Sequence, residues 1–131
     1  MPPLSEQAVW LLLALLFAHW LGDFTPLATA RMQKAKVAGG PVGPILAHAG
    51  VHALLVCVVI FLLRPPRWLE AFALAGALEF ATHFGLDAVR AKLTAGVPAL
   101  ADPTHKAFWS LLGFDQFLHA AVLVAIAWIV L

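Results

Sequence analysis

Four long apolar segments dominate this chain, and they limit what it can fold into. They cover residues 8–30, 44–63, 68–89 and 113–131. A helix needs roughly 20 mainly apolar residues to cross a bilayer, and each segment has about that length. Of the 131 residues, 63% are hydrophobic and 11% are charged, whereas soluble domains average about 45–50% and about 25%. The sequence therefore predicts an all-α integral membrane bundle of four transmembrane helices, formed by residues 1–131 as a single domain.

Positive charge is unevenly divided among the connections, which predicts an orientation. Residues 31–41 and 90–112 each carry three Lys or Arg, whereas the connection between the second and third segments carries only Arg64 and Arg67. Because Lys and Arg collect on the cytoplasmic side, we expect both termini on the non-cytoplasmic side. The basic residues are interpreted as topology anchors, residues 31–41 as a loop, and residues 104–112 as a short interfacial helix.

The first segment ends near a stretch of small residues that resembles a signal-peptide cleavage site. A signal peptide also has a positively charged N-terminal region. The residues that precede this segment include Glu6 and no Lys or Arg. We therefore expect the first segment to be a retained membrane helix.

Each apolar segment carries one pair of ionisable residues spaced four positions apart. The pairs are His19 with Asp23, His48 with His52, His83 with Asp87, and Asp115 with His119. Residues four apart project from the same face of a helix. Because successive segments cross in opposite directions, all four pairs fall in the cytoplasmic half of the bilayer, roughly one to three helical turns below the interface. The spacing therefore predicts that the eight side chains meet at a common depth.

A bound divalent cation is our leading explanation for these polar groups. A charged aspartate at the bilayer centre costs about 2.5–3.5 kcal/mol, and a cation offsets that cost directly. Imidazole and carboxylate ligands suit Zn, Mn, Fe, Co or Ni, and the lone Cys57 excludes a thiolate-rich site. The predicted metal ligands are His19, Asp23, His48, His52, His83, Asp87, Asp115 and His119.

Glu79 extends the third pair by one more helical turn, deeper into the membrane. It is a candidate ligand, or a candidate general base acting on metal-bound water. The alternative is a protonated glutamate that is hydrogen-bonded within the bundle.

Three alternatives to a divalent-ion site remain open for the whole set: a structural network, a proton or ion relay, and a haem site. Hydrogen bonds between histidines and aspartates can hold membrane helices together without any ion. Intramembrane ionisable residues also form proton or ion relays, and two histidines on facing helices suffice for a haem, although a haem leaves the aspartates unexplained.

The chain lacks the basic stripe of a nucleic-acid-binding protein, so we expect no nucleic-acid partner.

Four motifs, taken together and in this order, resemble the DUF3307 family of small bacterial integral membrane proteins. They are His19 with Gly22-Asp23-Phe24, the His48 and His52 pair, Thr82-His83 with Asp87, and Asp115-Gln116 with His119. The resemblance covers nearly the whole chain. It implies a multi-pass protein of the bacterial inner membrane with this fold and site, and it implies no particular reaction. The layout is also loosely similar to small membrane proteins called metal-dependent hydrolases.

The sequence thus predicts a metal-binding membrane protein, with catalysis left open. If the protein is an enzyme, we expect metal-assisted hydrolysis of a lipid or lipid-linked substrate at the cytoplasmic interface, with Glu79 or an aspartate accepting the proton. The alternative is a metal-binding or metal-transporting protein without catalysis. Transport predicts a homo-oligomer, because four helices are few for a transporter. Membrane lipid is the expected partner in every case.

Overall fold

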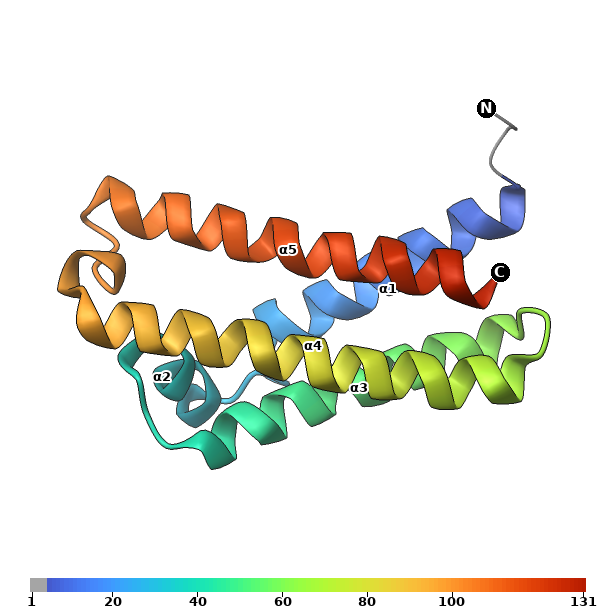
Figure 1. Ribbon diagram of the computed structural model, residues 1–131, viewed down its shortest axis with the longest axis horizontal. Coiled ribbons are helices and arrows are strands. Elements are labelled where there is room, and N and C mark those ends of the chain that lie inside the picture. Colours follow the sequence, from blue (N-terminus) through green and yellow to red (C-terminus); the bar gives the residue numbers. More distant parts are fainter. Residues whose placement is uncertain (1–4) are drawn as a thin grey trace.

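The computed structural model describes residues 5–131, and all regular secondary structure in this part of the chain is helical (Figure 1). The helices are α1 (Glu6–Phe24), α2 (Ala30–Ala38), α3 (Val42–Leu63), α4 (Trp68–Gly96) and α5 (Lys106–Val130), with a short 3-10 turn at Pro98–Leu100. The all-α prediction is therefore confirmed.

Four long helices lie lengthwise and the short helix α2 covers one end (Figure 1). The start of α1, the turn between α3 and α4, and the end of α5 share the opposite end of the molecule. The most extensive packing is between α3 and α4, while α2 packs against both of these helices. Helix α2 is thereby held beside the halves of α3 and α4 that carry their polar pairs.

The first helix ends at Phe24, six residues before the predicted limit of residue 30. Thr25 adopts an extended backbone, and its hydroxyl donates a hydrogen bond to the carbonyl of Leu21. Pro26 then prevents continuation, because it lacks a backbone donor and clashes with the preceding turn.

Residues 31–41, predicted as a loop, contain most of helix α2. The Thr29 side chain caps its N-terminus by accepting a hydrogen bond from the Met32 amide at 3.3 Å. Gly39 ends it in the left-handed conformation, with a φ of 67°. A threonine before the first turn and a glycine after the last are the usual limits of a helix, so local sequence explains why these residues fold.

The last two long helices are longer than predicted. Helix α4 continues to Gly96, well past residue 89. The interfacial helix expected at residues 104–112 is the first part of α5, which runs without a break from Lys106. Gly113, where the fourth segment was expected to begin, lies within this continuous helix. A single glycine costs only about 1 kcal/mol in a helix interior, so it does not divide α5.

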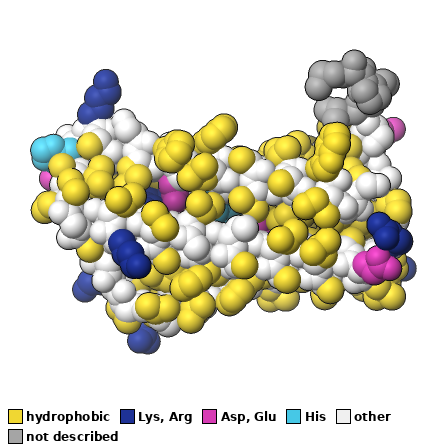
Figure 2. Space-filling model, viewed as in Figure 1, with side chains coloured by type: hydrophobic (Ala, Val, Ile, Leu, Met, Phe, Trp, Pro, Cys, Tyr) yellow, Lys and Arg dark blue, Asp and Glu magenta, His cyan; other side chains and the backbone are white. Residues whose placement is uncertain are grey.

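Helices α1, α3 and α5 are each long and apolar enough to cross a membrane. Helix α4 is the longest of all but is more polar, because charged side chains occur along most of its length. Large apolar side chains are nevertheless exposed on α4, among them Leu69 at 68% and Leu74 at 45%. Figure 2 shows apolar side chains over the middle of the visible face, with most visible Lys and Arg near its two ends. These features are those of a membrane protein.

The buried residues form three successive layers along the bundle. An apolar cluster that includes Leu15, Ile60 and Leu123 fills one part, and a smaller cluster of Ala35, Ile45 and Ala91 lies beside α2. Along α3 and α4, the buried histidines and carboxylates fall between the members of these two clusters. The fold thus encloses a polar layer between two apolar ones.

Candidate metal centre

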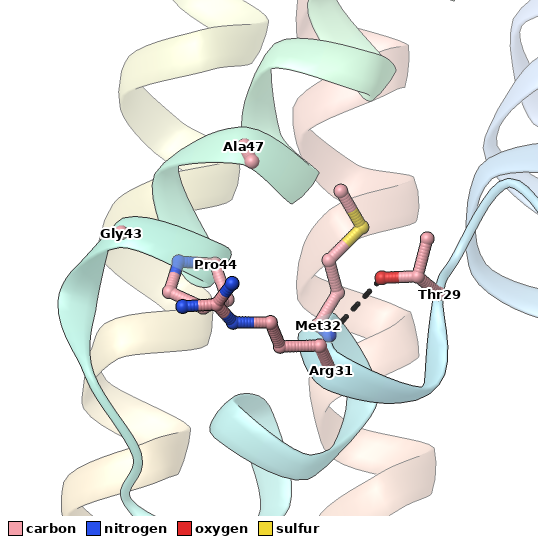
Figure 3. Close-up of a pocket in the computed structure, with 6 residues that line it drawn as sticks. All are labelled: Thr29, Arg31, Met32, Gly43, Pro44 and Ala47. Carbon is pink, nitrogen blue, oxygen red and sulfur yellow. Dashed lines mark hydrogen bonds between the residues drawn. The ribbon is translucent and has the colours of Figure 1, made fainter.

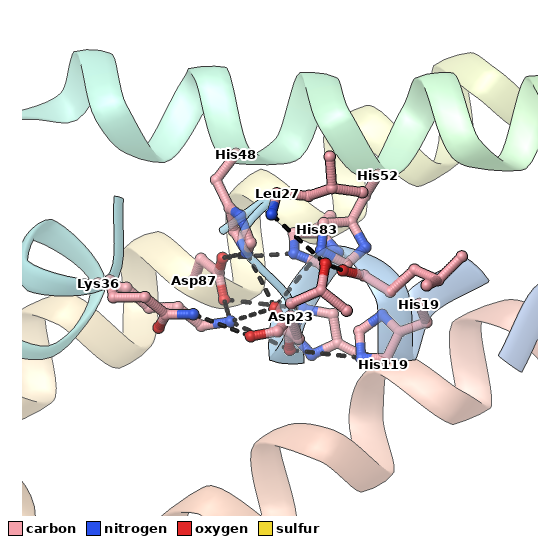
Figure 4. A network of polar contacts seen from close by, with 12 residues as sticks. His19, Asp23, Leu27, Lys36, His48, His52, His83, Asp87 and His119 are labelled. Atoms are coloured by element: carbon pink, nitrogen blue, oxygen red, sulfur yellow. Dashed lines mark hydrogen bonds and ion pairs between the residues drawn. The ribbon is translucent and has the colours of Figure 1, made fainter. Parts of the chain in front are cut away.

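Helices α1, α3, α4 and α5 each turn polar side chains towards the centre of the bundle (Figure 4). The i, i+4 spacing puts both members of each pair on one face of their helix, and packing makes that face the interior. All eight predicted ligands and Glu79 are buried, from His19 at 8% exposure to Asp87 at 0%. The predicted convergence of the four pairs is therefore present in the structure.

Three overlapping groups of side chains have the spacing of a metal site. Within each group, one nitrogen or oxygen atom per residue lies within 4.8 Å of the others. The groups are His19, His52, Glu79 and His83; Asp23, His48, His52 and His83; and His83, Asp87 and His119. His83 belongs to all three. The buried cluster could therefore hold a metal ion, with His83 at its centre.

The hydrogen bonds of two histidines leave one ring nitrogen of each free for a ligand. The Nδ1 atom of His119 donates to the carbonyl oxygen of Asp115 at 2.9 Å, because a carbonyl can only accept. The Nδ1 atom of His83 lies 3.1 Å from the Glu79 carboxylate. In neutral rings both Nε2 atoms then carry a lone pair. Carboxylates and carbonyls orient metal-binding histidines in this manner.

Several of these buried atoms have no hydrogen-bond partner among residues 5–131. They include the Nε2 atoms of His52, His83 and His119 and the Oδ2 atom of Asp87. Buried polar groups are almost always satisfied, so this concentration of bare acceptors is itself a signal. His83 Nε2 lies 3.4 Å from Asp87 Oδ2. Two ligands about 2.1 Å from a tetrahedral ion are separated by about that distance, so the residues present fit a divalent metal.

Asp115, predicted as a ligand, lies outside the three groups. Its Oδ2 atom accepts a hydrogen bond from Arg90 at 2.7 Å, and both residues are buried. Arg90 was interpreted as a topology anchor that closes the third segment, but it instead joins α4 to α5 inside the bundle. The structure thus pairs the Asp115 carboxylate with the Arg90 guanidinium.

Gln116 links two members of the cluster across helices. Its Nε2 atom donates to Asp23 Oδ2 at 2.8 Å, and its Oε1 atom accepts from His19 Nε2 at 3.1 Å. His19 therefore carries its proton on Nε2, which leaves Nδ1 as its free nitrogen. The DUF3307-like motif included Gln116, and its position next to Asp115 was the available signal for this role.

Lys36 is the residue that sequence reasoning missed. It reaches in from α2 (Figure 4), is 3% exposed, and its Nζ atom lies 3.2 Å from Asp23 Oδ1 and 3.0 Å from Asp87 Oδ1. Burial alone would lower the pKa of Lys36, but the carboxylates of Asp87 and Asp23 outweigh burial and raise that pKa above its ordinary value. Lys36 is therefore a buried cation, not a solvated anchor.

Acidic side chains outnumber Lys and Arg among the buried residues. Four carboxyl groups are buried, those of Asp23, Glu79, Asp87 and Asp115, against the two basic side chains of Lys36 and Arg90. Uncompensated negative charge in a membrane interior is costly, so a bound cation suits this interior.

Gly22 makes room for one of the histidine rings. A Cβ atom added at Gly22 would lie 2.4 Å from His52 Cε1 and 2.5 Å from His52 Nε2. Cβ atoms in real proteins essentially never lie within 3.0 Å of a neighbouring heavy atom. A side chain at residue 22 would therefore displace the His52 ring. The glycine before Asp23 thus sets the position of a neighbouring helix's histidine.

Fold and side chains together define a helical membrane protein with a buried centre of histidines and carboxylates. The chain belongs to the family described as "Protein of unknown function (DUF3307)", whose model matches residues 11–131. This confirms the family expected from the motifs. Neither the curated proteins nor the solved structures contain a match to this chain.

Proposed function

We propose that this chain is a divalent-metal-binding integral membrane protein. The observation that carries the proposal is that His83, Asp87 and His119 form one candidate metal group, in which the two Nε2 atoms and Asp87 Oδ2 have no hydrogen-bond partner among residues 5–131. Nitrogen and oxygen ligands without thiolate suit Zn, Mn, Fe, Co or Ni. A purely structural polar network, the main alternative, would be expected to satisfy these atoms with hydrogen bonds.

In this proposal α1, α3, α4 and α5 all cross the bacterial inner membrane, with both termini on the non-cytoplasmic side. Helix α4 supports a fourth span because its charged residues Glu79, Asp87 and Arg90 are buried while Leu69 and Phe80 are exposed. The end that contains α2 also carries exposed Arg31 and Lys34, as the cytoplasmic side of a membrane protein does. The metal centre then lies in the cytoplasmic half.

Metal-assisted hydrolysis of a lipid or lipid-linked substrate is a second candidate function. It is favoured by an open pocket of about 330 Å³ between α2 and α3, lined by Thr29, Arg31, Met32, Gly43, Pro44 and Ala47 (Figure 3). Arg31 suits a phosphate-bearing headgroup, and Ala47 directly precedes His48. A divalent metal lowers the pKa of bound water towards neutrality. Glu79 is the candidate base, although its carboxylate already contacts His83.

Metal analysis of the protein purified in detergent tests the principal proposal. We expect a divalent transition metal in the wild type and its loss in a His48→Ala/His52→Ala variant that stays folded. His105→Ala is the matched control, because His105 is an exposed histidine whose side chain is 59% accessible. Equal metal content in all three proteins would contradict a site in the cluster.

Two further measurements separate the functions that the metal could serve. Hydrolysis predicts turnover of a phospholipid or lipid-linked substrate in micelles, without metal flux. Transport predicts metal uptake into proteoliposomes and an oligomer of this chain. Metal binding with neither activity identifies a non-catalytic metal protein.

A further inference from the structure

The Lys36 ammonium bridges carboxylates that belong to two different candidate metal groups. Asp23 is grouped with His48, His52 and His83, whereas Asp87 is grouped with His83 and His119. Lys36 Nζ lies within 3.2 Å of an oxygen of each aspartate. The ammonium is therefore placed at the junction of the two groups.

Lysine at this position opposes a second ion rather than helping to bind it. A protonated ammonium has three donors and no acceptor, so it cannot ligate a metal. Its charge repels any cation that approaches the same carboxylates, and this repulsion is strong where water is excluded. Carboxylate-and-histidine helical bundles often hold two metal ions, and the overlapping groups here offer enough ligands for such a pair.

Removing the ammonium would free the oxygens that it now contacts. In Lys36→Met, Asp23 Oδ1 and Asp87 Oδ1 would lose the Nζ atom that lies 3.2 Å and 3.0 Å away. Each aspartate would then be available to a different candidate metal group.

We propose that the centre binds one divalent cation and that Lys36 is the fixed counter-cation that takes the place of a second. Lys36 is thus a residue that sets metal stoichiometry. This inference rests on the proposed metal binding. It adds how many ions bind and which side chain limits that number.

The test compares zinc stoichiometry in wild type, Lys36→Met, Lys36→Arg and Lys34→Met, each purified in detergent and dialysed against Zn²⁺. Lys34 is the matched control because it is an exposed lysine on the same helix. We expect one ion per chain in wild type, Lys34→Met and Lys36→Arg, and two in Lys36→Met. With Mn²⁺ as the probe, Lys36→Met alone should show the spin-coupled spectrum of two adjacent ions.

The results that would overturn the inference are distinct from those that would overturn metal binding itself. One ion in the wild type and one in folded Lys36→Met, with no change in affinity, would refute the role of Lys36 alone. Two ions in the wild type would refute it as well, even if Lys36→Met does not fold. A folded wild type that binds no ion would refute the proposed function and this inference together.

Discussion

The Nδ1 atom of His83 lies 3.1 Å from Glu79 Oε1, one turn away on α4, and its Nε2 atom lies 3.4 Å from Asp87, one turn away on the other side. One helix thus presents a histidine between two carboxylates. Glu79 contacts one ring nitrogen, and the other nitrogen, buried and without a hydrogen bond among residues 5–131, is left to bind.

Replacing Glu79 should weaken metal binding without removing a central ligand. In Glu79→Ala the His83 ring loses its oriented Nδ1 contact, and loss of such a partner typically lowers metal affinity about 10- to 100-fold. Competition with a chelator in detergent measures the change. Glu70→Ala is the control, since Glu70 lies on the same helix with its side chain 72% exposed. Unchanged affinity in Glu79→Ala would show that Glu79 does not orient the site.

Gly22→Ala should displace His52. The added methyl would sit 2.4 Å from the imidazole, and the forced shift should destabilise the protein by about 1–3 kcal/mol and reduce metal affinity. Gly50→Ala is the matched control, because a Cβ there meets nothing within 4 Å, and alanine is the better helix former. Unfolding in a denaturing detergent series compares the two variants. Equal stability and metal affinity would contradict the close approach of α1 to His52.

Arg90 and Asp115 should contribute to stability rather than to metal binding. Removing one partner of a buried ion pair leaves an uncompensated charge and costs about 3–5 kcal/mol. Arg90→Met and Asp115→Leu should therefore each be strongly destabilised, and the double variant should recover part of the loss. Thermal unfolding of all four proteins in the same detergent gives the coupling energy.

Metal content distinguishes a structural role of Asp115, as the partner of Arg90, from a role as a metal ligand. Folded Asp115→Leu/Arg90→Met should keep its ion, because Asp115 lies outside the three candidate groups. Loss of the ion from this folded variant would instead identify Asp115 as a ligand, as the sequence pattern alone suggested.

Removing the metal should lower the stability of the wild type. An ion that binds only the folded state stabilises it by about 2.7 kcal/mol when its free concentration is 100 times the dissociation constant. We therefore expect a chelator to lower the unfolding temperature and added Zn²⁺ or Mn²⁺ to restore it. The unfolding temperature of the His48→Ala/His52→Ala variant should change with neither the chelator nor the added metal. A wild type whose unfolding temperature also stays the same under both treatments would favour the metal-free network.

The sequence predicted the parts of this structure that depend on regular spacing. Pairs at i, i+4 must share a helix face, and in a membrane that face turns inwards, so His83 and Asp87 could be placed in the interior without coordinates. The family was recognisable for the same reason, because its motifs are these pairs. Helix limits were less accurate: Pro26 ended α1 early, whereas Gly113 did not interrupt α5.

Lys36 could not be placed from spacing, because its burial depends on how α2 packs against the other helices. The signals for α2 itself were present in Thr29 and Gly39, which cap it. Nothing local indicates that this basic helix folds back against α3 and α4 so that one lysine reaches Asp23 and Asp87. The pairing of buried acidic side chains with buried basic ones could not be predicted either, because Arg90 and Lys36 were both interpreted as topology anchors at the membrane surface.

The most direct test of the account is the metal content of His83→Ala, because His83 belongs to all three candidate groups. Wild type and His83→Ala would be purified in the same detergent, incubated with Zn²⁺, dialysed, and analysed for metal and for helical content. The account predicts about one ion per chain in the wild type and almost none in His83→Ala at equal helical content. A folded wild type without metal, or a His83→Ala variant that retains the ion, would contradict it.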